Sequence, residues 1–81
     1  KGEVTMNKRL VVFQGPNDVV EFVRKVTKYP YDMDMKHGRY IVDAKSLLGL
    51  MNLGFQKKIE LKVYGDDCEE LWNDIREFVA A

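Results

Sequence analysis

The chain has 81 residues, which is the size of one small domain. Its 13 basic and 13 acidic residues cancel to a formal net charge of zero, and no basic stripe favours nucleic-acid binding. A single cysteine excludes an internal disulfide, and no apolar run reaches the length of a membrane span. We therefore expect a cytoplasmic protein that binds neither nucleic acid nor a membrane.

The beginning of the chain lacks the apolar core of a signal peptide. Residues 1–7 are expected to form a frayed end, with Met6 as an alternative beginning. Residues 8–81 are expected to form a single domain. No repeat, linker or low-complexity segment divides them.

Residues 9–14 are β-branched and aromatic-rich, which predicts a strand that runs to Gln14. Gly15-Pro16 breaks this strand, and Asn17 or Asp18 is expected to cap a helix. The apolar positions of that helix share one face. They are Val19, Phe22, Val23 and Val26.

Residues 31–36 alternate between apolar and polar side chains, which predicts a strand with one face in water. His37-Gly38 is expected to turn the chain, because Gly38 tolerates a positive φ. Residues 39–42 then return as the second strand of a hairpin. Residues 58–64 alternate again and predict a further strand.

Between these strands, Ser46 is expected to cap a short helix that Gly54 ends. The helix is apolar over more than the one face that so short a helix buries. We therefore expect Leu47 or Leu48 to be exposed as part of a docking patch, with a core position as the alternative. The apolar residues are Leu47, Leu48, Leu50, Met51 and Leu53.

After Gly65, Asp66 or Asp67 is expected to cap a last helix. Its apolar stripe comprises Cys68, Leu71, Trp72, Ile75, Phe78 and Val79. The predicted order is therefore β-α-β-β-α-β-α. An α+β fold with a four-stranded antiparallel sheet and three helices on one face accommodates this order. The core is expected to comprise Val19, Phe22, Val23, Val26, Ile59, Leu61, Val63, Leu71, Ile75 and Phe78.

No catalytic arrangement can be built from these residues, and no cofactor is implied. His37 is interpreted as a solvated turn residue and Cys68 as an inert buried thiol. Asp32 and Asp34 share a strand face with Asp43 nearby in sequence. Such carboxylates suggest a metal, but a solvated sheet face is the favoured reading, and we expect no metal site.

The pattern Lys-Ser-x-x-Gly-x-Met-x-Leu-Gly over residues 45–54 resembles the regulatory-serine region of HPr. HPr is the histidine-containing phosphocarrier of the bacterial sugar phosphotransferase system. The resemblance extends from the first strand to the last helix and implies an open-faced β-sandwich. It puts Ser46 on the regulatory serine and Phe22-Val23 on a Phe-Val pair of the family's first helix.

Counting back from Phe22-Val23 puts Gly15 where the family has its phosphorylated histidine. Asn17 and Asp18 stand where the family has arginine and proline. The motif His-x-Arg-Pro is therefore absent, and His37 lies in another segment. The chain is similar in this respect to catabolite-repression HPr-like proteins, which lack the histidine and keep the serine.

This resemblance implies a non-catalytic module that is involved in sugar transport and catabolite regulation. An HPr kinase would phosphorylate Ser46, and a sugar-responsive transcription regulator would bind the helix through Leu47, Leu48 and Met51. Ser46 as a plain helix cap is the alternative at the level of the residue. At the level of the protein, the alternatives are a phosphocarrier of the phosphotransferase system and a structural interaction domain. The chain is expected to be a monomer or a weak dimer, and a structural interaction domain would dimerise through the open sheet.

Overall fold

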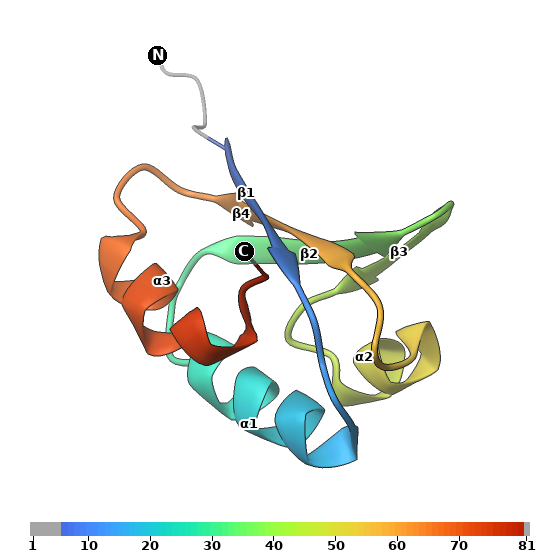
Figure 1. Cartoon of the computed structure of the whole chain (residues 1–81). Coiled ribbons are helices and arrows are strands. Elements are labelled where there is room, and N and C mark those ends of the chain that lie inside the picture. The colour runs from blue at the N-terminus through green and yellow to red at the C-terminus, as the bar shows by residue number, and fades with distance from the viewer. Residues whose placement is uncertain (1–5, 81) are drawn as a thin grey trace.

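The computed structural model describes residues 6–80 (Figure 1). The expected frayed end lies outside the described residues over positions 1–5, whereas Met6 and Asn7 belong to the first strand. The predicted α+β fold is confirmed, with every strand and helix in the predicted order. The elements are β1 (Met6–Val11), α1 (Pro16–Val26), β2 (Asp32–His37), β3 (Tyr40–Asp43), α2 (Leu47–Leu53), β4 (Ile59–Tyr64), α3 (Glu69–Asp74) and a 3-10 turn, η1 (Arg76–Phe78).

The four strands form one antiparallel sheet in the order β1-β4-β2-β3. The three helices cover one face of this sheet, and the opposite face is open (Figure 1). On the covered face, Leu61 lies between Arg9 and Met35. On the open face, Lys62 lies between Lys8 and Asp34. The alternation of the sequence therefore sets which side chains meet the helices.

The core lies between the sheet and the helices. Nine of the ten predicted core residues are buried, and Val23 packs half-buried against them. Met33 and Met35 of β2 join them, so the predicted half-wet strand has its apolar side in the core. The remaining buried residues are Val11, Phe13, Ala44, Leu50, Leu53 and Cys68.

Phe13 is the reason that the predicted strand to Gln14 is wrong. The strand β1 ends at Val11, and the Phe13 side chain is fully buried. Its ring lies edge-on to Phe22 at 5.1 Å and to Phe78 at 6.0 Å between ring centres. The Phe13 carbonyl also accepts a 2.7 Å hydrogen bond from the Gln56 N–H. Burial of this ring thus outweighs continuation of the strand.

The start of α1 also differs from the prediction that Asn17 or Asp18 caps it. The helix begins at Pro16, whose fixed φ suits the first helical position, and Gly15 is its N-cap residue without a side-chain cap. The Asp18 carboxylate instead accepts the Gln14 N–H at 2.9 Å. This carboxylate therefore binds the loop that precedes the helix.

The predicted final helix is shorter than its apolar stripe. The helix α3 has Cys68 as its N-cap and ends at Asp74, and η1 follows. The Asp67 carboxylate accepts the Glu69 N–H at 3.4 Å without being the cap residue. Beyond η1 the chain pairs with β1, since the Ala80 N–H donates to the Leu10 carbonyl at 2.8 Å. This pairing requires an extended backbone, so the helix cannot continue.

The hairpin turn also lies one residue later than predicted. His37 is the last residue of β2 and is half-buried, whereas Gly38 and Arg39 make the turn. Gly38 has the positive φ that this turn requires, at 62°.

A polar cluster joins the end of α1 to α3. The Asp74 carboxylate accepts the Tyr29 hydroxyl at 2.9 Å and lies 2.9 Å from the Lys28 ammonium. The hydrogen bond from Lys28, then that from Tyr29, lowers the pKa of Asp74 below its usual 3.8. Burial, and then the bond to Asp74, raises the pKa of Tyr29 to about 12. The folded protein therefore favours an ionised Asp74 and a neutral Tyr29.

We expect Asp74→Asn to lower the melting temperature at pH 7. Because folding lowers the pKa of Asp74, its contribution is complete above the unfolded value of 3.8 and is lost as the pH falls through the lower folded value. The difference between the variant and the wild type should therefore shrink towards pH ~2. Thermal melts against pH measure this. Asp66→Asn, at an exposed carboxylate, is the control and should follow the wild type; a constant gap down to the lowest pH would contradict the assignment.

Candidate functional site

Ser46 begins α2 as predicted. Its backbone is extended, with φ −98° and ψ 108°, and its Oγ accepts the Gly49 N–H at 3.1 Å. Its carbonyl accepts the Leu50 N–H at 3.0 Å. The serine thus satisfies one of the unpaired N–H groups at the helix start. At the other end, Gly54 closes the helix with a φ of 98°, a conformation that favours glycine.

The loop that presents Ser46 is held at both ends. The Asp43 carboxylate accepts the Lys45 N–H at 2.8 Å, and the Asp43 carbonyl accepts the Ser46 N–H at 3.0 Å. The Lys45 ammonium reaches across to the Tyr29 carbonyl, at 2.7 Å, beyond the end of α1. Ala44 between them is fully buried. Ser46 is therefore fixed relative to both β3 and α1.

Gly49 lets α2 start close to the sheet. A Cβ atom on Gly49 would lie 3.0 Å from Val42 Cβ and 3.2 Å from Ser46 Oγ, which is closer than ordinary packing. Any larger side chain here would therefore push the helix away from β3 or displace the capping hydroxyl.

The exposed apolar residues of α2 lie directly after the serine. Leu48 is 78% exposed and Leu47 is 41% exposed. Leu50 and Leu53 are buried, and Met51 packs half-buried against the core. The expected exposure is therefore present at both leucines, with Met51 at the margin. We define Ser46, Leu47, Leu48 and Met51 as the serine-helix surface.

The start of α1 holds no imidazole. Gly15 has extended backbone angles, and a Cβ atom placed on it would meet nothing within 4 Å. Asp18 lies in the first turn of the helix, where its negative charge matches the helix dipole. His37 lines a hollow of about 440 Å³ with Tyr40, Val42, Asn52, Leu53 and Lys57, none of which belongs to α1. Thus His37 is not placed at this helix start.

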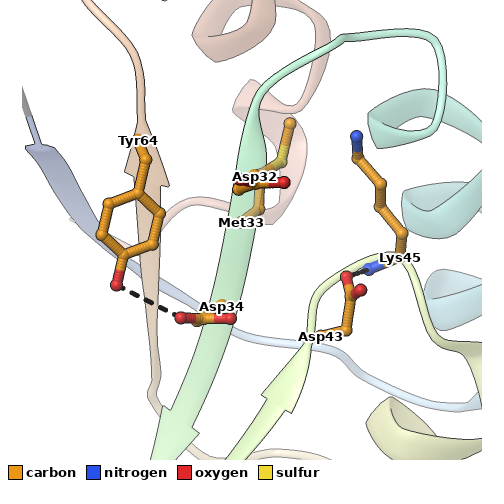
Figure 2. Close-up of a pocket in the computed structure, with 6 residues that line it drawn as sticks. All are labelled: Asp32, Met33, Asp34, Asp43, Lys45 and Tyr64. Atoms are coloured by element: carbon orange, nitrogen blue, oxygen red, sulfur yellow. Dashed lines mark hydrogen bonds between the residues drawn. The ribbon is translucent and has the colours of Figure 1, made fainter. Parts of the chain in front are cut away.

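The strand carboxylates meet in a hollow of about 410 Å³ (Figure 2). Asp34 Oδ2 accepts the Tyr64 hydroxyl at 3.2 Å, and Asp43 lies opposite Asp34 on the neighbouring strand. Burial, and then this hydrogen bond, raises the pKa of Tyr64. No group of three or more His, Cys, Asp or Glu residues within 6–80 could hold a metal ion. The alternation of the sequence predicted that Asp32 and Asp34 share one face, but it did not predict the contact of Asp34 with Tyr64.

The remaining candidates have structural roles. The Cys68 thiol is buried, and burial raises its pKa. Such a thiol is a poor nucleophile at neutral pH. Trp72 is half-buried, with the Arg9 guanidinium 4.7 Å from its ring centre. Within residues 6–80, no helix has the length and apolar character that crossing a membrane requires.

The open-faced sheet, the three covering helices and the serine-capped α2 define a small α+β protein of the open-faced β-sandwich class. The family model for the PTS HPr component phosphorylation site matches residues 19–81, and the chain therefore belongs to the HPr family. The matched region begins after Gly15 and Asp18.

Solved structures support the same fold. HPr from Bacillus anthracis strain Ames is 23% identical and has a TM-score of 0.74, with 94% of this chain and 99% of that chain covered. HPr-C-His from Thermoanaerobacter tengcongensis is 22% identical and has a TM-score of 0.70, with 90% and 88% covered. The Bacillus subtilis catabolite repression protein Crh, a swapped and intertwined dimer, is 26% identical and has a TM-score of 0.63, with 100% and 95% covered. A search of curated proteins finds no match.

We expect Ser46→Ala to cost ~1 kcal/mol of unfolding free energy, because the Gly49 N–H loses its acceptor. Ser46→Asp should retain most of that stability, since a carboxylate also caps a helix. Urea unfolding monitored by circular dichroism measures both. Leu48→Ala is the control and should change stability little, because Leu48 is largely exposed. Equal losses for alanine and aspartate at Ser46 would contradict the capping role.

Proposed function

We propose that this chain is a regulatory binding module that docks protein partners through the serine-helix surface, without phosphoryl transfer through histidine. One observation carries the proposal. The residue two positions after the capping serine, Leu48, is 78% exposed in a helix whose other side is buried in the core.

A single exposed leucine is common on protein surfaces and needs no function. Here Met51 lies about one helical turn from both Leu47 and Leu48, so the three side chains share one side of α2. The loop before them is held by the bonds of Asp43 and Lys45. Because this surface is already ordered, binding a partner costs little of this chain's conformational entropy. This favours recognition of α2 as a preformed helix.

Phosphorylation of Ser46 would regulate this docking. A phosphate adds close to two negative charges at neutral pH and would stand beside the exposed leucines. It would change which partner binds, while the burial of Leu50 and Leu53 maintains the helix. The likeness to HPr and to the catabolite repression protein Crh supports an HPr kinase as the writer and a sugar-responsive transcription regulator as the reader. The cytoplasm is the proposed location.

The phosphocarrier reaction needs an imidazole nitrogen at a helix start, where backbone N–H groups stabilise the phosphate. Gly15 provides no such nitrogen, and the Asp18 carboxylate adds a negative charge close to where the phosphate would lie. A carrier function therefore remains the second candidate, supported by the family model alone. A structural interaction domain is the third.

We expect no phosphate on the wild-type chain after incubation with enzyme I and phosphoenolpyruvate. Gly15→His should fold normally, because the backbone is extended and a Cβ atom placed on Gly15 meets no neighbour within 4 Å. It should accept phosphate slowly, and Gly15→His combined with Asp18→Asn about tenfold faster, since a repelling charge is removed. Mass spectrometry at neutral and acidic pH detects the acid-labile phosphohistidine. Phosphate on wild-type His37 at the rate of a carrier would overturn the proposal.

We expect Leu47→Glu and Leu48→Glu to slow the labelling of Ser46 by HPr kinase and ATP about tenfold each, with melting temperatures close to the wild type. The matched control is Leu10→Glu on β1, since Leu10 is 42% exposed and Leu47 is 41% exposed. The control should be labelled at the wild-type rate. If all three variants are labelled equally, or if the wild type is not labelled, Ser46 is a plain cap and the docking proposal fails.

A further inference from the structure

We propose that the free edge of β3 pairs with the β3 edge of a second copy of this chain, antiparallel and centred on Ile41. This surface is separate from Leu47 and Leu48, so the inference goes beyond the proposed docking function. It rests on the backbone, the register and the charges of four consecutive positions, Tyr40 to Asp43, and on Arg39 before them.

The outer edge of β3 is available for pairing at Ile41 and at the Asp43 N–H, whereas the Asp43 carbonyl already accepts the Ser46 N–H. Among the described residues, β3 is the last strand of the sheet, with β2 on its inner side only (Figure 1). The Ala44 N–H donates inward, to the Met33 carbonyl, at 3.0 Å. Because donors alternate along an antiparallel strand, the N–H groups of Ile41 and Asp43 point outward. An outward row of this kind is a template for another strand.

Two of the three exposed side chains of β3, Tyr40 and Ile41, are largely apolar, which is unusual for an edge left to water. Tyr40 is 62% exposed and Ile41 is 59% exposed. Natural edge strands usually carry charges or proline to prevent pairing. The interior of β3 has neither, since its charge lies only at Asp43 and in the flanking turn at Arg39.

The charges at the ends of this segment match a two-fold contact. An axis beside Ile41 places Ile41 against Ile41 of the second copy and Tyr40 against its Val42. The same axis places Arg39 against Asp43 of the second copy, and Asp43 against its Arg39, which gives two opposite-charge pairs. Moving the axis to Arg39 or to Asp43 would set like charges against each other. Among the axes beside Arg39, Ile41 and Asp43, the charges thus favour the one beside Ile41.

Within residues 6–80, Arg39 and Asp43 contact no opposite charge, although the Arg39 guanidinium lies 5.8 Å from the Tyr40 ring centre. Asp43 lies directly opposite Asp34 in the β2–β3 register, and like charges in that position are unfavourable. The Lys45 ammonium points away from Asp43 (Figure 2) and donates to the Tyr29 carbonyl instead. Arg39 of a second copy would supply the missing cation.

The contact is small, because each strand contributes four residues. We therefore expect a weak dimer, populated at protein concentrations on the order of 100 μM and above. Salt should weaken it, since both ion pairs are exposed. Each protomer stays intact in this dimer, in contrast to one formed by exchange of elements.

Charge reversal tests the register. Arg39→Glu and Asp43→Arg should each raise the dimer dissociation constant about tenfold or more, because each variant sets two like-charge pairs against each other. An equimolar mixture of the two variants should associate as well as the wild type, since both pairs become opposite in charge again. Sedimentation equilibrium measures the constants, and native mass spectrometry identifies the mixed dimer by mass.

Two controls separate this contact from other causes. Arg76→Glu makes the same charge change at an exposed residue of η1 and should leave the dimer unchanged. Asp43→Asn retains an acceptor for the Lys45 N–H, so it should weaken the dimer without disturbing the loop. The inference is overturned if the wild type stays monomeric at ~1 mM. It is also overturned if the single variants dimerise like the wild type, or if their mixture does not associate.

Discussion

The contact among Phe13, Phe22 and Phe78 is the constraint on which the placement of the helices depends. The rings of Phe22 and Phe78 lie 5.7 Å apart, and Phe13 contacts both edge-on. The three come from the loop after β1, from α1 and from η1. Such a cluster gains both apolar burial and favourable ring geometry. It fixes where the first strand ends and where the chain turns back to pair with β1. The buried position of Phe13 also sets where the chain enters α1 at Pro16.

The two helix starts of this protein then have opposite chemistry. At α1, Gly15 gives no side chain, and the Asp18 carboxylate places a negative charge on the preceding loop. At α2, the Ser46 hydroxyl oxygen caps the helix by accepting the Gly49 N–H, and exposed leucines follow it. Backbone N–H groups lie at both helix starts, but only the start of α2 combines the hydroxyl that we propose is phosphorylated with an exposed apolar surface. This contrast supports a regulatory module over a carrier.

The sequence predicted the elements whose side chains repeat regularly and missed those decided by contacts distant in sequence. Alternation placed Ile59, Leu61 and Val63 in the core, and the Ser46 cap and Gly54 end bounded α2. The end of β1 was wrong because β propensity cannot anticipate that Phe13 packs against Phe78. The final helix was too long for the same reason, since pairing of Ala80 with Leu10 interrupts it. Helix geometry was enough to predict that Leu47 or Leu48 is exposed. The contact between Tyr64 and Asp34 could not be predicted without knowing that β4 lies beside β2.

Asp43 connects the sheet edge to the serine. Its carbonyl and carboxylate hold the backbone of Ser46 and Lys45, while its side chain lies on the open face opposite Asp34. A charge that stabilises the loop thus also creates a like-charge pair in the sheet. The two hydrogen bonds of the loop act against this repulsion. Anything that brings a cation to Asp43 from beyond β3 would relieve the repulsion without breaking those bonds. The position of Ser46 and the charge of the sheet edge are therefore set by one residue.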